Sequence, residues 1–140
     1  MVDYKEIASY IIILAVVLIV AQHLNVVVSG SMEPVFYRGD IVAVEKADLL
    51  GIHEFDPKDV KINDIVVYDA KWFNQPVIHR IIDIKEINGT TMYVIKGDNN
   101  NRTDPYYVSA DQIQAKVMTL GENPVVIPKI GYLSLWLRGL

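Results

Sequence analysis

Apolar residues are concentrated near the N-terminus, where the segment Ile7–Val28 carries no Asp, Glu, Lys or Arg. A helix of about 20 residues crosses the hydrocarbon core of a bilayer, so this segment is long enough to span a membrane with a little tilt. A removable signal peptide is the weaker interpretation, because no basic region precedes the apolar run and no Ala-x-Ala pattern follows it. The pattern therefore predicts a retained transmembrane anchor within residues 1–28.

After residue 28 the apolar run gives way to short segments in which β-branched residues recur. Five of them are predicted as strands: Asp40–Lys46, Asp64–Asp69, Val77–Ile87, Thr91–Lys96 and Ile113–Leu120. The pair Asn88-Gly89 separates two of these strands and is a strong signal for a tight hairpin turn, because both residues tolerate positive φ. No later segment has a long helical period. Residues 29–140 are therefore predicted to form one mainly antiparallel β domain.

The stretch Leu49–Lys61 is the least regular part of this domain and is expected to be a surface loop. It holds His53, Glu54 and Asp56, residue types that bind metals. No second cluster of such residues occurs elsewhere in the sequence. A solvated acidic loop therefore explains them better than a metal site.

The segment Ile130–Leu140 is apolar but too short to span a bilayer. Leu133, Leu135 and Leu137 alternate along it, as in a strand with one apolar face. We therefore expect a final strand that packs on the core or lies against the membrane surface.

Charge and composition narrow the classes of function. The net charge is −4 and no run of Lys or Arg is present, which argues against nucleic acid as the main partner. The chain has no cysteine, so disulfides, thiol catalysis and thiolate metal sites are excluded. Lys5 and the terminal amine precede the anchor, and no basic residue follows it before Arg38. By the positive-inside rule this favours a cytoplasmic N-terminus and an external domain.

A candidate nucleophile lies directly after the anchor, in the segment Ser29–Pro34. Gly30 gives the backbone before Ser31 conformational freedom and Pro34 stiffens the exit, so the Ser31 hydroxyl can be held at a defined, exposed point. An ordinary turn leaving a membrane helix would use the same residue types. A serine hydroxyl is a poor nucleophile unless a neighbouring base takes its proton, so the rest of the sequence must supply one.

Three histidines are candidates for that base. His23 is at the end of the anchor and His53 is in the acidic loop, whereas His79 is inside a predicted strand among apolar residues. A hydrogen-bonded structural histidine is the alternative for His79, and a catalytic one needs a partner that fixes its tautomer. Asp98 and Asp104 lie six residues apart in a polar loop, and either carboxylate is a suitable partner.

Four ordered motifs together resemble type I signal peptidases. They are Ser-Gly-Ser-Met-Glu-Pro at 29–34, Arg-Gly-Asp-Ile-Val at 38–42, Val-Ile-His-Arg at 77–80, and Gly-Asp-Asn-Asn at 97–100 followed by an aspartate at 104. The bacterial branch of that family has lysine where this chain has His79. The chain is therefore similar to the archaeal and endoplasmic-reticulum branch.

The resemblance implies roles for five residues. Ser31 would be the nucleophile, His79 the general base and Asp104 the residue that completes the site. Asp98 would support the loop, with its role open to exchange with that of Asp104, and Ser29 would donate to the oxyanion. The implied fold is a small antiparallel β-barrel-like catalytic domain, shared with self-cleaving repressors, after one transmembrane helix.

The implied function is a membrane-bound serine endopeptidase that removes signal peptides from secreted preproteins after small residues, on the extracytoplasmic face. The implied partners are preprotein signal peptides and the lipid bilayer, and no metal or cofactor is implied. Two alternatives remain open. One is a serine–lysine peptidase that uses Lys71 or Lys85 as base, and the other is a non-catalytic anchored module that binds extended peptides.

Overall fold

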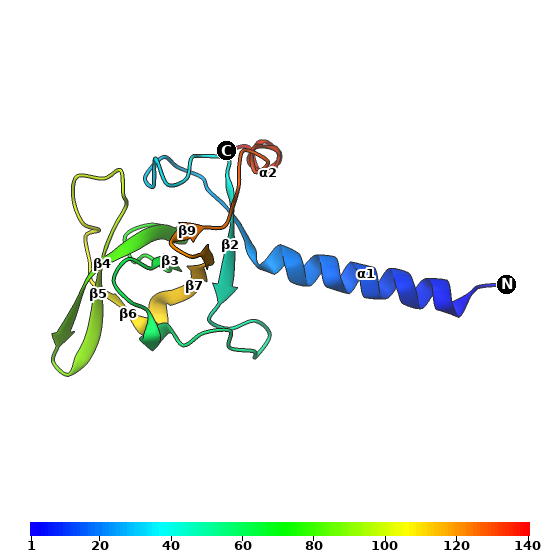
Figure 1. The fold of residues 1–140 in the computed structure, drawn as a ribbon, viewed down its shortest axis with the longest axis horizontal. Coiled ribbons are helices and arrows are strands. Elements are labelled where there is room, and N and C mark those ends of the chain that lie inside the picture. The colour runs from blue at the N-terminus through cyan, green and yellow to red at the C-terminus, as the bar shows by residue number, and fades with distance from the viewer.

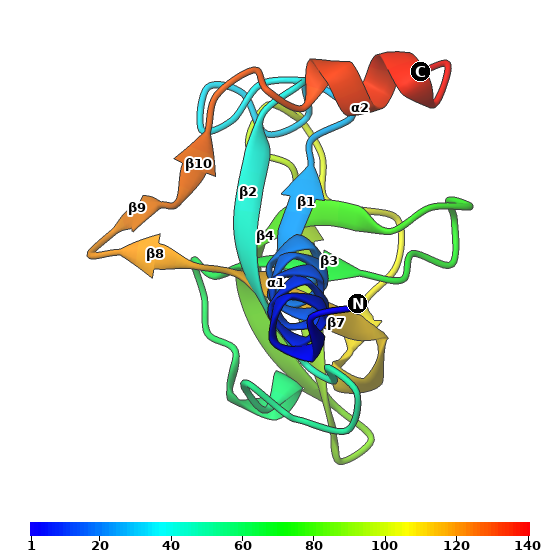
Figure 2. The same cartoon turned by 90° about the vertical axis from the view of Figure 1, so that its right-hand side faces the viewer.

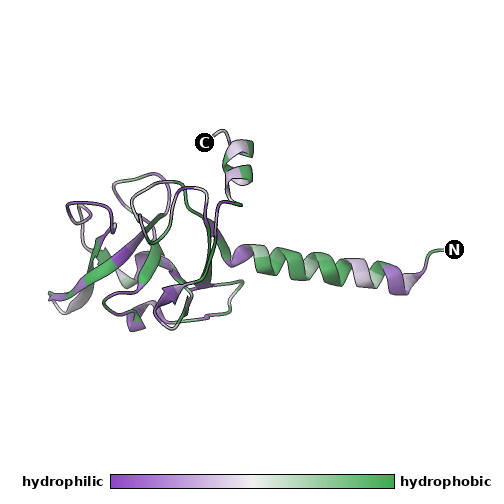
Figure 3. Cartoon of the chain, turned by 45° about the horizontal axis from the view of Figure 1, so that its top comes forward, coloured by the Kyte–Doolittle hydropathy of each residue, from purple (hydrophilic) through white to green (hydrophobic).

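The computed structural model describes the whole chain, Met1 to Leu140, as one long helix leading into a β domain (Figure 1). Helix α1 spans Tyr4–Gln22, and the Asp3 side chain caps its N-terminus by accepting a hydrogen bond from the Lys5 N–H. None of its residues is buried by the domain, and the helix is long and apolar enough to cross a membrane. Figure 3 shows this apolar surface along most of the helix, after a polar first turn.

The helix is shorter than the expected span from Ile7 to Val28. It ends at Gln22, and Leu24–Val26 forms strand β1, which pairs with β2. Apolar valines suit a membrane helix and a strand equally well, so composition alone extended the predicted span too far.

The domain is a mainly antiparallel β structure, which confirms the predicted fold class. Every strand pair is antiparallel. The strands are β1 (Leu24–Val26), β2 (Ile41–Lys46), β3 (Ile65–Tyr68), β4 (Val77–Ile87), β5 (Thr90–Lys96), β6 (Val108–Ser109), β7 (Ile113–Val117), β8 (Thr119–Leu120), β9 (Asn123–Pro124) and β10 (Val126–Ile127). Two short 3₁₀ helices, η1 (Pro57–Asp59) and η2 (Ala110–Gln112), lie in the connections.

The strand order in the main sheet is β1-β2-β7-β3-β4-β5-β6, with β10 also paired to β2. Strand β7 therefore lies between β2 and β3 and joins the part of the sheet that carries β1 to the part that carries β4. The hairpin between β4 and β5 has the predicted tight turn, with φ of 52° at Asn88 and 76° at Gly89.

Strand β3 is buried on both faces and separates two apolar clusters. Val66 and Tyr68 point into the cluster that also holds residues of β4 and β5. Ile65 and Val67 point into the cluster that holds Met32 and residues of β2 and β7. The alternation follows from the two-residue period of a strand. The turn after β1 and the start of β4 therefore both pack against β3.

The C-terminal segment is not the strand that its alternating leucines predicted. It contains a short helix, α2 (Tyr132–Leu137), in which only Leu135 is buried. Figure 2 shows that α2 lies across the top of the domain. A period of two over three leucines cannot be distinguished from a helical turn that buries one of them.

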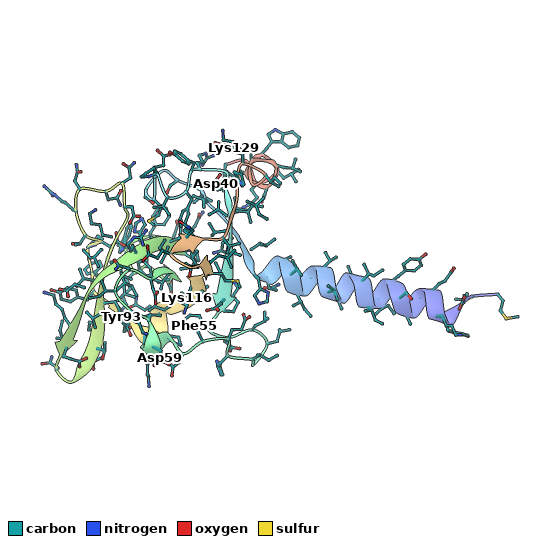
Figure 4. The ribbon with its side chains drawn as sticks, viewed as in Figure 1. Asp40, Phe55, Asp59, Tyr93, Lys116 and Lys129 are labelled. Atoms are coloured by element: carbon teal, nitrogen blue, oxygen red, sulfur yellow. The ribbon has the colours of Figure 1, made fainter.

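Tertiary contacts hold α2 in place. The Asp40 carboxylate accepts a hydrogen bond from the Lys129 N–H at 3.0 Å, and both residues lie at the α2 end of the domain (Figure 4). A Cβ atom at Gly131 would lie 2.6 Å from the Gly39 carbonyl oxygen, so only glycine allows this close approach.

Helix α1 is joined to the domain by side chains as well as by the chain. His23 caps the C-terminal end of α1, and its Nε2 lies 2.8 Å from a carboxylate oxygen of Glu54 in the predicted surface loop. Glu54 also accepts a hydrogen bond from the Lys46 N–H at 2.8 Å. These contacts connect the end of α1 to β2 and to the loop that follows it.

Candidate active site

The turn that follows β1 presents Ser31 beside β4. Met32 is completely buried and anchors this turn in the core, while Ser31 itself stays partly exposed. The Asn99 N–H donates to the Ser31 carbonyl at 2.9 Å, and the Asn99 side chain donates to the Gly30 carbonyl at 3.0 Å. The backbone on both sides of the Ser31 Cα is therefore fixed by the loop after β5.

His79 projects from β4 toward this serine. It shares the buried face of the strand with Val77 and Ile81, and only 4% of it is exposed. Its Nε2 lies 2.9 Å from the Ser31 hydroxyl oxygen, and its Nδ1 lies 2.8 Å and 3.0 Å from the two carboxylate oxygens of Asp104. The carboxylate favours the tautomer with its proton on Nδ1, which leaves Nε2 free to accept the serine proton.

Asp104 lies beneath the imidazole with 3% of its side chain exposed. Its N–H donates to the Ile95 carbonyl at 2.8 Å, which ties the loop back to β5. The Tyr68 hydroxyl donates to its Oδ2 at 2.6 Å. Burial, together with the adjacent Asp104 carboxylate, raises the pKa of the Tyr68 phenol far above its ordinary value, so this group remains a proton donor.

The second candidate carboxylate, Asp98, is not hydrogen-bonded to His79 in the structure. It accepts two hydrogen bonds from the Arg80 guanidinium, at 2.9 Å and 2.7 Å. These bonds raise the pKa of Arg80 further, although its partial burial acts in the opposite direction. Arg80 also donates to the Asn63 carbonyl, so this ion pair fixes the start of the polar loop to β4 and to the loop before β3.

Ser29 is exposed, and its hydroxyl oxygen lies 3.1 Å from that of Ser31. The Ser31 N–H points toward the same Ser29 oxygen at 3.5 Å. Two donors, the Ser29 hydroxyl and the Ser31 N–H, therefore lie next to the Ser31 hydroxyl. Such a pair has the composition of an oxyanion-binding site.

Comparison with known proteins identifies the family of this chain. The uncharacterized protein MJ0260 of Methanocaldococcus jannaschii is 34% identical over 89% of this chain and 88% of its own length. The signal peptidase complex catalytic subunits SEC11 of Scheffersomyces stipitis and Lachancea thermotolerans are each 33% identical, over 79% and 80% of this chain. The chain belongs to the family of MJ0260 and is similar to the SEC11 catalytic subunits of the signal peptidase complex.

The chain spans 62% and 64% of the length of those two SEC11 relatives. No family model matches the chain. MJ0260 is itself uncharacterized, so the function named among these relatives is that of the SEC11 subunits.

A pocket of about 680 Å³ opens beside the Ser31 hydroxyl. Its apolar wall is formed by side chains from β1, the turn after it, β3, β4 and the loop between them: Val26, Val28, Val67, Trp72, Phe73, Pro76, Val77 and Ile78. Arg138 and Leu140, from the C-terminal end of the chain, also line it. Neither Lys71 nor Lys85, the alternative bases, is part of its lining.

The other two histidines lie away from this pocket. His23 contacts the Ile19 carbonyl and Glu54, and the His53 ring contacts the Ala47 carbonyl. No group of three or more His, Asp or Glu side chains in the structure is arranged to hold a metal ion.

Sequence reasoning overlooked three residues of the site. Asn99 was treated only as part of a polar turn, and Gly97 only as part of a motif. Tyr68 was treated only as a strand residue, because nothing local distinguishes it from a core tyrosine. Its contact with Asp104 joins positions 36 residues apart and becomes visible only when β3 is placed beside the loop after β5.

Proposed function

We propose that this chain is a membrane-anchored serine endopeptidase that removes N-terminal signal peptides from secreted preproteins. One observation carries the proposal. The Ser31 hydroxyl, the His79 imidazole and the Asp104 carboxylate form a continuous hydrogen-bonded series, with 2.9 Å between Ser31 and His79 and 2.8 Å between His79 and Asp104. This is the constellation that activates a serine nucleophile on many unrelated folds.

The arrangement suggests the order of events. His79 Nε2 takes the proton of the Ser31 hydroxyl as the serine oxygen attacks the scissile carbonyl, and the Asp104 carboxylate stabilises the imidazolium that forms. The Ser31 N–H and the Ser29 hydroxyl stabilise the negative charge on the tetrahedral intermediate. His79 then returns its proton to the leaving amine, and water repeats the sequence to release the acyl group.

The surroundings of Ser31 suit an extended, apolar substrate. Strand β1 is at the edge of the sheet, because all its backbone pairing is with β2, so its other edge is free to pair with a peptide. Val28, Val77 and Ile78 in the pocket wall favour apolar side chains over charged ones. We infer that small residues before the scissile bond fit closest to Ser31.

The helix α1 gives the proposal its location. It is an apolar helix of 19 residues that ends shortly before β1, so the nucleophile is held close to the membrane surface where a signal peptide emerges. Confinement to the same surface as the substrate raises their effective concentration. We propose a single-pass topology with a cytoplasmic N-terminus and an extracytoplasmic catalytic domain, because Lys5 precedes the helix.

The proposal is tested by incubating the detergent-solubilised chain with a preprotein and sequencing the new N-terminus of the product. We expect a single cut after a small residue, lost in Ser31→Ala while the Tm is retained, because this substitution leaves no unpaired buried charge. Binding of the preprotein without any cleavage by the intact chain would contradict the proposal and favour a peptide-binding module.

A further inference from the structure

We propose that Tyr68 is a positioning residue of this active site, whose phenol hydroxyl holds the Asp104 carboxylate in the orientation that His79 requires. The inference rests on the proposed function and adds a fourth side chain to its machinery. Tyr68 does not touch the substrate or the reacting atoms in this scheme and acts only through Asp104.

The contact is short and completely enclosed. Tyr68 is the last residue of β3, and 1% of it is exposed. Its ring belongs to the core cluster formed with Val66, Ile81 and Ile95, so it cannot swing away without opening the core. Its hydroxyl donates to Asp104 Oδ2 at 2.6 Å, and the same oxygen lies 2.8 Å from His79 Nδ1.

Tyr68 and His79 are the only side chains that donate to the Asp104 carboxylate. One donor alone leaves a carboxylate free to rotate about its Cβ–Cγ bond, because that torsion has a broad energy minimum. Two donors that come from different strands restrict this rotation. The second hydrogen bond also shifts part of the negative charge of Asp104 onto the phenol. The carboxylate therefore stabilises an imidazolium less strongly.

The charges around the pair support a local effect. Asp104 is the charged group that contacts His79. Two neutral hydroxyl groups complete the surroundings: that of Ser31 contacts His79, and that of Tyr68 contacts Asp104. The nearby cation on β4, Arg80, is already bonded to Asp98. The Tyr68 hydroxyl is therefore the one group besides His79 that directly compensates the Asp104 charge.

The experiment compares Tyr68→Phe with Tyr93→Phe in the full chain in detergent. Tyr93 is a matched control, since it is equally buried in the same cluster but directs its hydroxyl to the Pro57 carbonyl at 3.2 Å. Each variant loses one buried hydroxyl and keeps the ring. A merely structural role for Tyr68 predicts the same behaviour for both.

For Tyr68→Phe we expect kcat on a preprotein to fall about tenfold with little change in KM, because one hydrogen bond to a charged group is lost. We also expect the acid limb of the rate profile to move to higher pH, since a less compensated Asp104 holds the imidazolium more tightly. In the Asp104→Asn background, the same substitution should have almost no further effect on kcat. Equal kinetics and pH profiles for Tyr68→Phe and Tyr93→Phe would overturn the inference.

A second readout does not depend on turnover. The ring nitrogens of His79 are followed by ¹⁵N NMR during a pH titration of the wild type and both variants, with Ser31→Ala used to prevent self-digestion. If the pH midpoint of the His79 titration moves upward only in Tyr68→Phe, the inference is supported, even if the wild type cleaves no preprotein. Absence of cleavage by the wild type would contradict the proposed function alone. An unchanged midpoint in Tyr68→Phe overturns the inference whatever the activity.

Discussion

Substitution of Gly97 by alanine tests how closely the polar loop packs against Ser31 and His79. The φ of Gly97 is outside the left-handed region, so an alanine can adopt the same backbone conformation. Its added Cβ would lie 2.7 Å from the Ser31 carbonyl oxygen and 2.9 Å from His79 Nε2, whereas ordinary contacts begin at 3.4 Å. The methyl group therefore enters the site itself.

The expected magnitude follows from which neighbour can move. The Ser31 carbonyl is held by the Asn99 N–H at 2.9 Å, so the imidazole gives way instead. A retreat of about 0.5 Å lengthens the bond from His79 Nε2 to the Ser31 hydroxyl from 2.9 Å to the limit of hydrogen bonding. Because a misplacement of about 1 Å can cost about 100-fold in rate, we expect kcat to fall between about 10-fold and 100-fold. Overpacking should cost about 1–2 kcal/mol of stability.

The assay measures preprotein cleavage rates and the Tm of Gly97→Ala beside Gly30→Ala. The atoms nearest to the added Cβ of Gly30→Ala belong to the side-chain carboxyl of Glu33, which is flexible and can move aside. We expect this second variant to lose less activity. A Gly97→Ala protein with a wild-type Tm and turnover within about threefold of the wild type would refute the reasoning, since the loop would then be loosely packed against His79.

Three further substitutions test other contacts of the structure. Asp104→Asn should reduce kcat by about 10³-fold or more, because an amide favours the wrong imidazole tautomer. Asp98→Asn should reduce kcat by less than about tenfold. If the measured kcat values rank the two variants in the reverse order, the roles of Asp104 and Asp98 are exchanged. Glu54→Gln should lower stability by about 0.5–1 kcal/mol near neutral pH, because the amide still accepts from the Lys46 N–H but no longer supplies the negative charge beside His23. Partial burial alone would raise the pKa of Glu54, but these hydrogen bonds outweigh it and lower the pKa. The stabilisation is therefore present above the ordinary pKa of Glu54 and lost in acid. The Tm difference between wild type and Glu54→Gln should shrink below about pH 4. A Tm difference that is independent of pH would contradict this account.

The parts of the fold that were predicted correctly are those with a strong local pattern. The β4–β5 hairpin follows from Asn88-Gly89, and the strand Val77–Ile87 has the predicted bounds. His79 alternates with apolar neighbours, which places it on the buried face of its strand.

The features that were missed depend on contacts between distant segments. Residues 130–140 were predicted as a strand because three leucines alternate, but contacts of Gly131 and Lys129 with the segment before β2 set up a helix. Sequence alone likewise left the choice between Asp98 and Asp104 open, because both lie in one loop within reach of β4. The Arg80 side chain distinguishes the two carboxylates, because its guanidinium is hydrogen-bonded to Asp98.

The position of β7 in the sheet has a consequence for the folding of the chain during its synthesis on the ribosome. The strand that supports Ser31 and the strand that carries His79 lie in parts of the sheet that meet only through β7, which is later in the sequence than either. A nascent chain whose β7 is still inside the ribosome therefore contains Ser31 and His79 but lacks the strand that connects their two parts of the sheet. Under the proposed function, cleavage activity should therefore appear only after Val117 has emerged, and an unfinished chain should be inactive.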